Sequence, residues 1–120
     1  MKAELKSIRS PDLLGEVATF HPEDPENFSL LLQLMIGVPG TTGEELFYVD
    51  LILCTPEWIK AELAEGGSMW GIDLLVVPHF EYKSLELVLK SKVNGVKGRS
   101  VIEITEKIDR LGRVNSLNDQ

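Results

Sequence analysis

Cys54, His21 and His79 are the residues of this sequence whose side chains most often act in catalysis. A cysteine nucleophile needs a base within hydrogen-bonding distance, and neither histidine is close to Cys54 along the chain. Cys54 also ends an apolar run, where a free cysteine usually packs as a small hydrophobic side chain. We therefore expect a structural thiol and no catalytic residue. A small cytosolic enzyme or metal-binding regulator that uses these three residues is the alternative.

Residues 21–27 place one histidine and three carboxylates in a polar loop whose two prolines exclude regular structure. Their spacing matches no familiar ligand pattern, and structural zinc sites prefer cysteine and histidine. The glycine-containing stretch at residues 37–43 has no lysine and leads into an expected strand, so it lacks the features of a phosphate-binding loop. We predict no metal ion and no cofactor.

The charge of the chain is concentrated in its middle. The formal net charge is −7, but residues 12–81 carry 13 carboxylates against one base, Lys60. Residues 82–120 carry eight bases against five acids. Net negative charge keeps a small domain soluble, and a local excess also attracts a basic partner and accelerates its association. Direct binding to nucleic acid is disfavoured, because phosphates would be repelled.

The carboxylates of this acidic region are the candidate partner contacts. Trp58 joins them because aromatic side chains often anchor interfaces, although its place in the first turn of an expected helix is equally compatible with packing on a sheet. The candidates are Glu23, Asp24, Glu26, Glu44, Glu45, Glu57, Trp58, Glu62 and Glu65.

The elements that must position these residues begin with a strand over residues 1–10. Its alternation places Leu5 and Ser7 on one face and Ile8 on the other. Residues 15–20 predict a short second strand because they include β-branched side chains. Two strongly apolar runs, residues 28–37 and 46–54, predict a β-hairpin with a helix over one face or burial on both faces.

A helix start at Thr55 is the sharpest local signal. Threonine caps helix N-termini, Pro56 suits the first helical position, and Glu57 complements the helix dipole. The helix should continue through Glu65 and stop at the glycines of residues 66–67. We expect its apolar side chains to include Ile59 and Leu63 beside Trp58.

The remaining elements are a strand at residues 69–80 and helices at residues 83–93 and 100–111. A strand start at residues 101–105 is an open alternative for the last helix. The fold class is α+β: an antiparallel sheet of four to five strands with one inserted helix and two C-terminal helices. We expect one domain over residues 1–113, followed by a frayed polar tail at residues 114–120.

The composition indicates a cytoplasmic protein without membrane contact. No apolar run approaches the roughly 20 residues that a membrane span needs. The N-terminus lacks a signal-peptide core, and the single cysteine forms no internal disulfide. We expect a monomer or weak homodimer.

Three stretches together carry a family resemblance. Residues 1–8 read MKAELKSI, residues 24–37 read DPENFSLLLQLMIG, and Phe47 is followed by CTPEW at residues 54–58. Over about residues 1–111 the chain resembles the immunity protein 8 family of bacterial polymorphic toxin systems.

The resemblance implies a small α+β protein made beside a secreted toxin, which neutralises that toxin inside the producing cell by binding and is not an enzyme. The acidity adds a basic toxin domain as the expected partner. A nuclease is the natural target, because enzymes that grip nucleic acid are basic.

Overall fold

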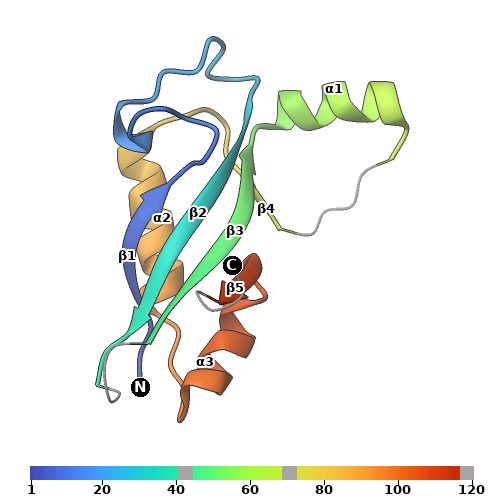
Figure 1. Ribbon diagram of the computed structural model, residues 1–120. Helices are drawn as coiled ribbons and strands as arrows, with labels where there is room; N and C mark the ends of the chain where they lie inside the picture. Colours follow the sequence, from blue (N-terminus) through green and yellow to red (C-terminus); the bar gives the residue numbers. More distant parts are fainter. Residues whose placement is uncertain (41–44, 69–72, 117–120) are drawn as a thin grey trace.

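Two long antiparallel strands form the centre of the sheet (Figure 1). In this computed structural model, which describes residues 1–40, 45–68 and 73–116, β2 spans Ser29–Val38 and β3 spans Glu45–Cys54. They pair in unbroken register from Ser29 opposite Cys54 to Val38 opposite Glu45. The predicted hairpin is therefore confirmed.

One face of this hairpin is buried and the other is half-exposed, because side chains alternate across a strand. The buried face of β2 and β3 consists of Leu30, Leu32, Leu34, Ile36, Val38, Phe47, Val49, Leu51 and Leu53. Helix α2 (Tyr82–Asn94) lies against the sheet in Figure 1 and contributes three buried side chains. Helix α3 (Val101–Ile108) adds two more, so a helix layer covers one face only.

The sheet has the order β1-β2-β3-β4, and β5 also pairs with β3. β1 (Glu4–Arg9) is antiparallel to β2. The outer edge of β3 is shared. β4 (Leu74–Val76) pairs with its last residues in parallel, and β5 (Arg113–Ser116) pairs with its first half antiparallel. The α+β class, with helix α1 (Pro56–Gly66) inserted and two helices near the C-terminal side, is confirmed.

A β-bulge corrects the predicted faces of β1. The register to β2 shifts between Leu5 and Ser7, so Lys6 is an extra residue. Leu5 and Ile8 consequently both pack against the core, whereas Ser7 is exposed. Strict alternation put Ile8 on the wrong face.

The predicted strand at residues 15–20 is wrong. Val17–Thr19 form a short 3₁₀ helix, η1, in which the N–H of Phe20 bonds the carbonyl of Val17 at 3.1 Å. Only Val17 is buried there. The β-branched residues lack a neighbouring strand to pair with, and strand propensity depends on that context.

Two other boundaries differ from expectation. Of the strand predicted at residues 69–80, the described part forms only β4, and residues 69–72 lie outside the described residues. The chain leaves the sheet before Phe80, whose N–H bonds the carbonyl of Pro25 at 3.0 Å.

The residues expected to begin a frayed tail contribute to β5 instead, and residues 117–120 lie outside the described part. Their docking depends on Gly112, because a Cβ there would lie 2.7 Å from the carbonyl oxygen of Asp50. Helix α3 begins at Val101 and ends at Ile108, so the alternative of a strand start at residues 101–105 is wrong.

Candidate functional site

Helix α1 starts from a buried anchor in the body of the protein. The Thr55 hydroxyl accepts the N–H of Trp58 at 3.4 Å, which caps the helix, and the N–H of Phe28 at 3.2 Å. Thr55 itself is fully buried. The predicted cap is confirmed, and it also ties the start of α1 to the residue that precedes β2.

The rest of α1 projects away from the body (Figure 1). The structure describes all of its residues, and none is buried. None belongs to the hydrophobic core or to the partly buried side chains that pack against it. Leu63 is 40% exposed, and Trp58 and Ile59 are half-exposed. Leu63 is thus an exposed apolar side chain on this helix, and Trp58 and Ile59 beside it are partly exposed.

Acidic and apolar side chains share one side of α1. Residues three or four apart are neighbours on a helix surface. Ile59 therefore lies beside Leu63, and Trp58 lies beside Glu62. Glu65 follows Glu62 by three residues, and both carboxylates are exposed. The surface combines apolar area with negative charge.

The acidic loop at residues 21–27 is held at both ends by aromatic packing. Phe20 precedes it, Phe28 follows it, and Phe80 packs edge to face against both, with ring centroids 5.2 and 5.8 Å apart. Within the loop, the Asp24 carboxylate accepts the N–H of Glu26 at 3.0 Å. Glu26 and its acidic neighbours in the loop are exposed.

The loop and α1 lie at the same end of the sheet, because Phe28 and Thr55 are hydrogen-bonded and Ser29 pairs with Cys54. We call residues 21–27 together with α1 the acidic end. Of the predicted contacts it holds Glu23, Asp24, Glu26, Glu57, Trp58, Glu62 and Glu65.

The structure separates Glu45 from the acidic end. Glu45 pairs with Val38 at the opposite end of the β2–β3 hairpin. Ten strand residues at about 3.3 Å each put roughly 30 Å between the two ends. Glu44 lies outside the described residues. The acidic candidates therefore do not form one patch.

Cys54 is fully buried, and burial raises the pKa of its thiol. The reactive thiolate is disfavoured as a result. His21 and His79 are exposed. In the described part of the chain, no three histidine, cysteine, aspartate or glutamate side chains are grouped closely enough to hold a metal ion.

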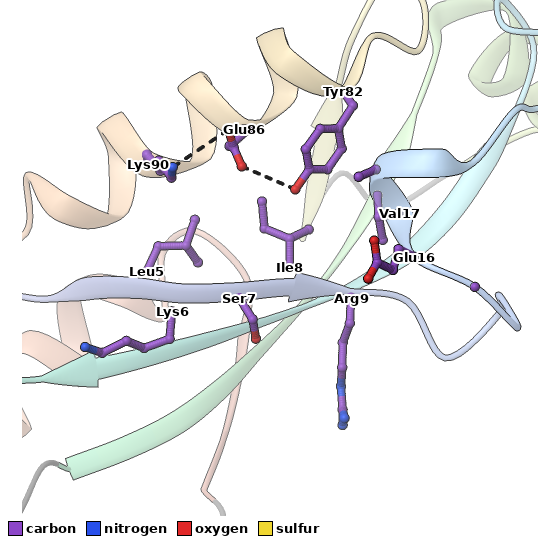
Figure 2. A pocket seen from close by; sticks show the side chains of 12 residues that line it. Leu5, Lys6, Ser7, Ile8, Arg9, Glu16, Val17, Tyr82, Glu86 and Lys90 are labelled. Atoms are coloured by element: carbon purple, nitrogen blue, oxygen red, sulfur yellow. Dashed lines mark hydrogen bonds and ion pairs between the residues drawn. The ribbon is translucent and has the colours of Figure 1, made fainter.

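A groove of about 490 Å³ between β1, η1 and α2 was not predicted from the sequence (Figure 2). Figure 2 shows Leu5 and Ile8 pointing toward α2. Above them the Tyr82 hydroxyl donates to Glu86 at 3.3 Å, and Glu86 meets Lys90 at 3.7 Å. Burial and the neighbouring Glu86 raise the pKa of Tyr82. These polar groups bond one another, so we interpret the groove as a consequence of packing between α2 and β1 and not as a ligand site. The four-residue spacing of Tyr82, Glu86 and Lys90 is the sequence pattern that could have indicated this groove.

Sequence comparison identifies the family. The profile described as Immunity protein 8 matches residues 3–114. The chain belongs to the immunity protein 8 family. Neither curated proteins nor solved structures give a match. This family assignment suggests an immunity function against a toxin. Across the described residues, no helix has the length and apolarity to cross a membrane.

Ile59, which is partly exposed, and Leu63, which is exposed, lie outside the hydrophobic core, and the sequence did not predict this position. Their spacing predicted an apolar helix side, which normally packs on the protein's own sheet. Nothing in that spacing distinguishes a side that covers the core from one that is left open, so an immunity protein 8 sequence alone does not reveal this surface.

Proposed function

We propose that this chain binds a cognate toxin domain and neutralises it by occlusion, with the acidic end as the contact surface. Membership of the immunity protein 8 family is the observation that carries the proposal. Under this proposal the chain acts by binding and has no catalytic role.

The charge of the acidic end supports a basic partner. The loop carries three carboxylates and no lysine or arginine, and α1 carries three carboxylates against Lys60, a net of −5. By contrast α2 carries three lysines against Glu86. Opposed potentials steer association and raise its rate. A toxin that grips nucleic acid has the complementary positive charge, so a nuclease is the target class that we propose.

Co-expression tests the function directly. The toxin domain encoded by the neighbouring gene should arrest growth alone and should not do so together with this chain. Purified components should form a complex in isothermal titration calorimetry. Absence of both protection and binding would refute the proposed function.

Salt dependence tests the contact surface. Glu62→Gln with Glu65→Gln should lower the association rate constant about three- to tenfold at low salt. The matched control, Glu4→Gln with Glu106→Gln, removes two exposed carboxylates outside the acidic end and should change the rate far less. If the association rate of the unmodified chain does not depend on ionic strength, the acidic end does not accelerate association electrostatically.

A further inference from the structure

Within the described residues, helix α1 adds no side chain to the hydrophobic core and is joined to the body by the Thr55 anchor. An isolated helix of 11 residues is marginal in water. Caps hold this one at both ends. Thr55 caps the start, and Gly67, at φ 76°, donates its N–H to the carbonyl of Leu63 at 2.8 Å. The ordering cost that a flexible segment would meet on binding is therefore already reduced before a partner arrives.

The exposed side of α1 has the dimensions and chemistry of an inserting helix. Eleven residues at 1.5 Å each give a rod about 16 Å long. Ile59 and Leu63 form an apolar pair on successive turns, bordered by Trp58 and the carboxylate of Glu62. This arrangement is typical of helices that bind with an apolar face in a groove. Their anchor side chains are three or four residues apart.

We infer that α1 is the element that enters the toxin domain, seating Ile59 and Leu63 in a concave apolar surface flanked by lysine or arginine. The inference rests on the proposed function, since it names how the toxin is engaged. Charge decides the occupant. Helix α1 and the neighbouring loop are both acidic, so a second copy docked through the same surface would bring like charges together, whereas a basic toxin would neutralise them.

Exposed apolar residues elsewhere lack this setting and supply a matched control. Leu87 on α2 and Ile102 on α3 are 70% and 72% exposed. Both lie on helices that bury several of their other apolar side chains in the core. They test whether any exposed apolar pair contributes to binding, or only the pair on α1.

The decisive experiment compares Ile59→Ala with Leu63→Ala, as a double variant, against Leu87→Ala with Ile102→Ala. The probe is the toxin domain encoded by the neighbouring gene, and the readouts are Kd, dissociation rate and unfolding midpoint. The α1 variant should weaken binding at least about 30-fold, mainly through faster dissociation, because central apolar anchors dominate interfaces. The control should bind within about threefold of the unmodified chain. Alanine keeps helix propensity, so both variants should unfold near the normal midpoint.

Hydrogen exchange separates contact from folding. Amides of α1 should exchange more slowly in the complex than in the free chain, while those of α3 should not change. If the α1 variant binds as tightly as the unmodified chain, the inference is overturned and the proposed function stands. If the unmodified chain itself does not bind, the proposed function fails first. Sedimentation adds a third outcome: a dimer of the free chain that the α1 variant abolishes would assign the surface to self-association and overturn the inference.

Discussion

Helices α1 and α2 are similar in length and differ in where their apolar side chains lie. Both have a side-chain cap, from Thr55 in α1 and from Glu81 in α2. Helix α2 buries Leu85, Leu89 and Val93, whereas α1 buries nothing. The difference shows that helical spacing of apolar residues predicts a face to be covered, but not that the same chain supplies the cover. In this protein α2 completes the core, and α1 contributes no buried residue to it.

Truncating one leucine in each helix should give the largest difference between α1 and α2 in the free energy of unfolding. Leu89→Ala should lower the free energy of unfolding by about 2–5 kcal/mol, because Leu89 is in the core. Leu63→Ala should change it by no more than about 0.5 kcal/mol. Urea unfolding monitored by circular dichroism measures both. Equal losses would mean that α1 packs on the body, and the distinction between the helices would disappear.

Removing the Thr55 hydroxyl should have an intermediate effect. Thr55→Val keeps the side-chain shape but deprives the buried N–H of Phe28 and the N–H of Trp58 of their acceptor. We expect a loss of about 1–3 kcal/mol in the free energy of unfolding. Ser100→Ala is the control, because Ser100 is exposed and accepts only the helical N–H of Glu103. A smaller loss for Thr55→Val than for this control would contradict the anchoring role.

The smallest effect concerns pH and again separates the two helices. The Ser84 hydroxyl, with the N–H groups of Ser84 and Lys83, lowers the pKa of Glu81 in the folded protein. Protons therefore bind the unfolded chain at higher pH than the folded one. The cap's contribution is complete above the ordinary glutamate pKa of about 4.3 and is lost as pH falls through the lower folded value.

The amide resonance of Ser84 should titrate with a midpoint below 4.3 in NMR spectra, and Glu81→Gln should abolish this titration. The capping group of α1 is a hydroxyl, so the Trp58 amide should show no midpoint from its cap. A midpoint at or above 4.3 for Ser84 would show that the carboxylate is not held by these donors.

The parts of the fold set by local chemistry were predictable. Thr55 and Pro56 predict the start of α1, and the long apolar runs predict β2 and β3. The bulge at Lys6, the 3₁₀ turn at Val17 and the docking of β5 depend on contacts between distant segments. Local propensity carries no information about those contacts.

The candidate site was predictable to a similar degree. Once the hairpin is assigned, its register places residues 21–27 beside the start of α1 and places Glu45 at the opposite end. Treating the carboxylates as one surface ignored that register. The exposure of Leu63 and the partial exposure of Ile59 could not be inferred, since they depend on the direction in which α1 leaves β3.

The shared outer edge of β3 has a consequence for synthesis on the ribosome. Asp50 pairs with Arg113, 63 residues later in the chain. At a synthesis rate of roughly 5–20 residues per second, about 3–13 s pass between the synthesis of Asp50 and that of Arg113. During that interval the edge from Phe47 to Asp50 offers unpaired backbone groups to any neighbouring chain. Chains ending before Arg113 should retain this open edge, and we expect them to aggregate where longer chains remain dispersed.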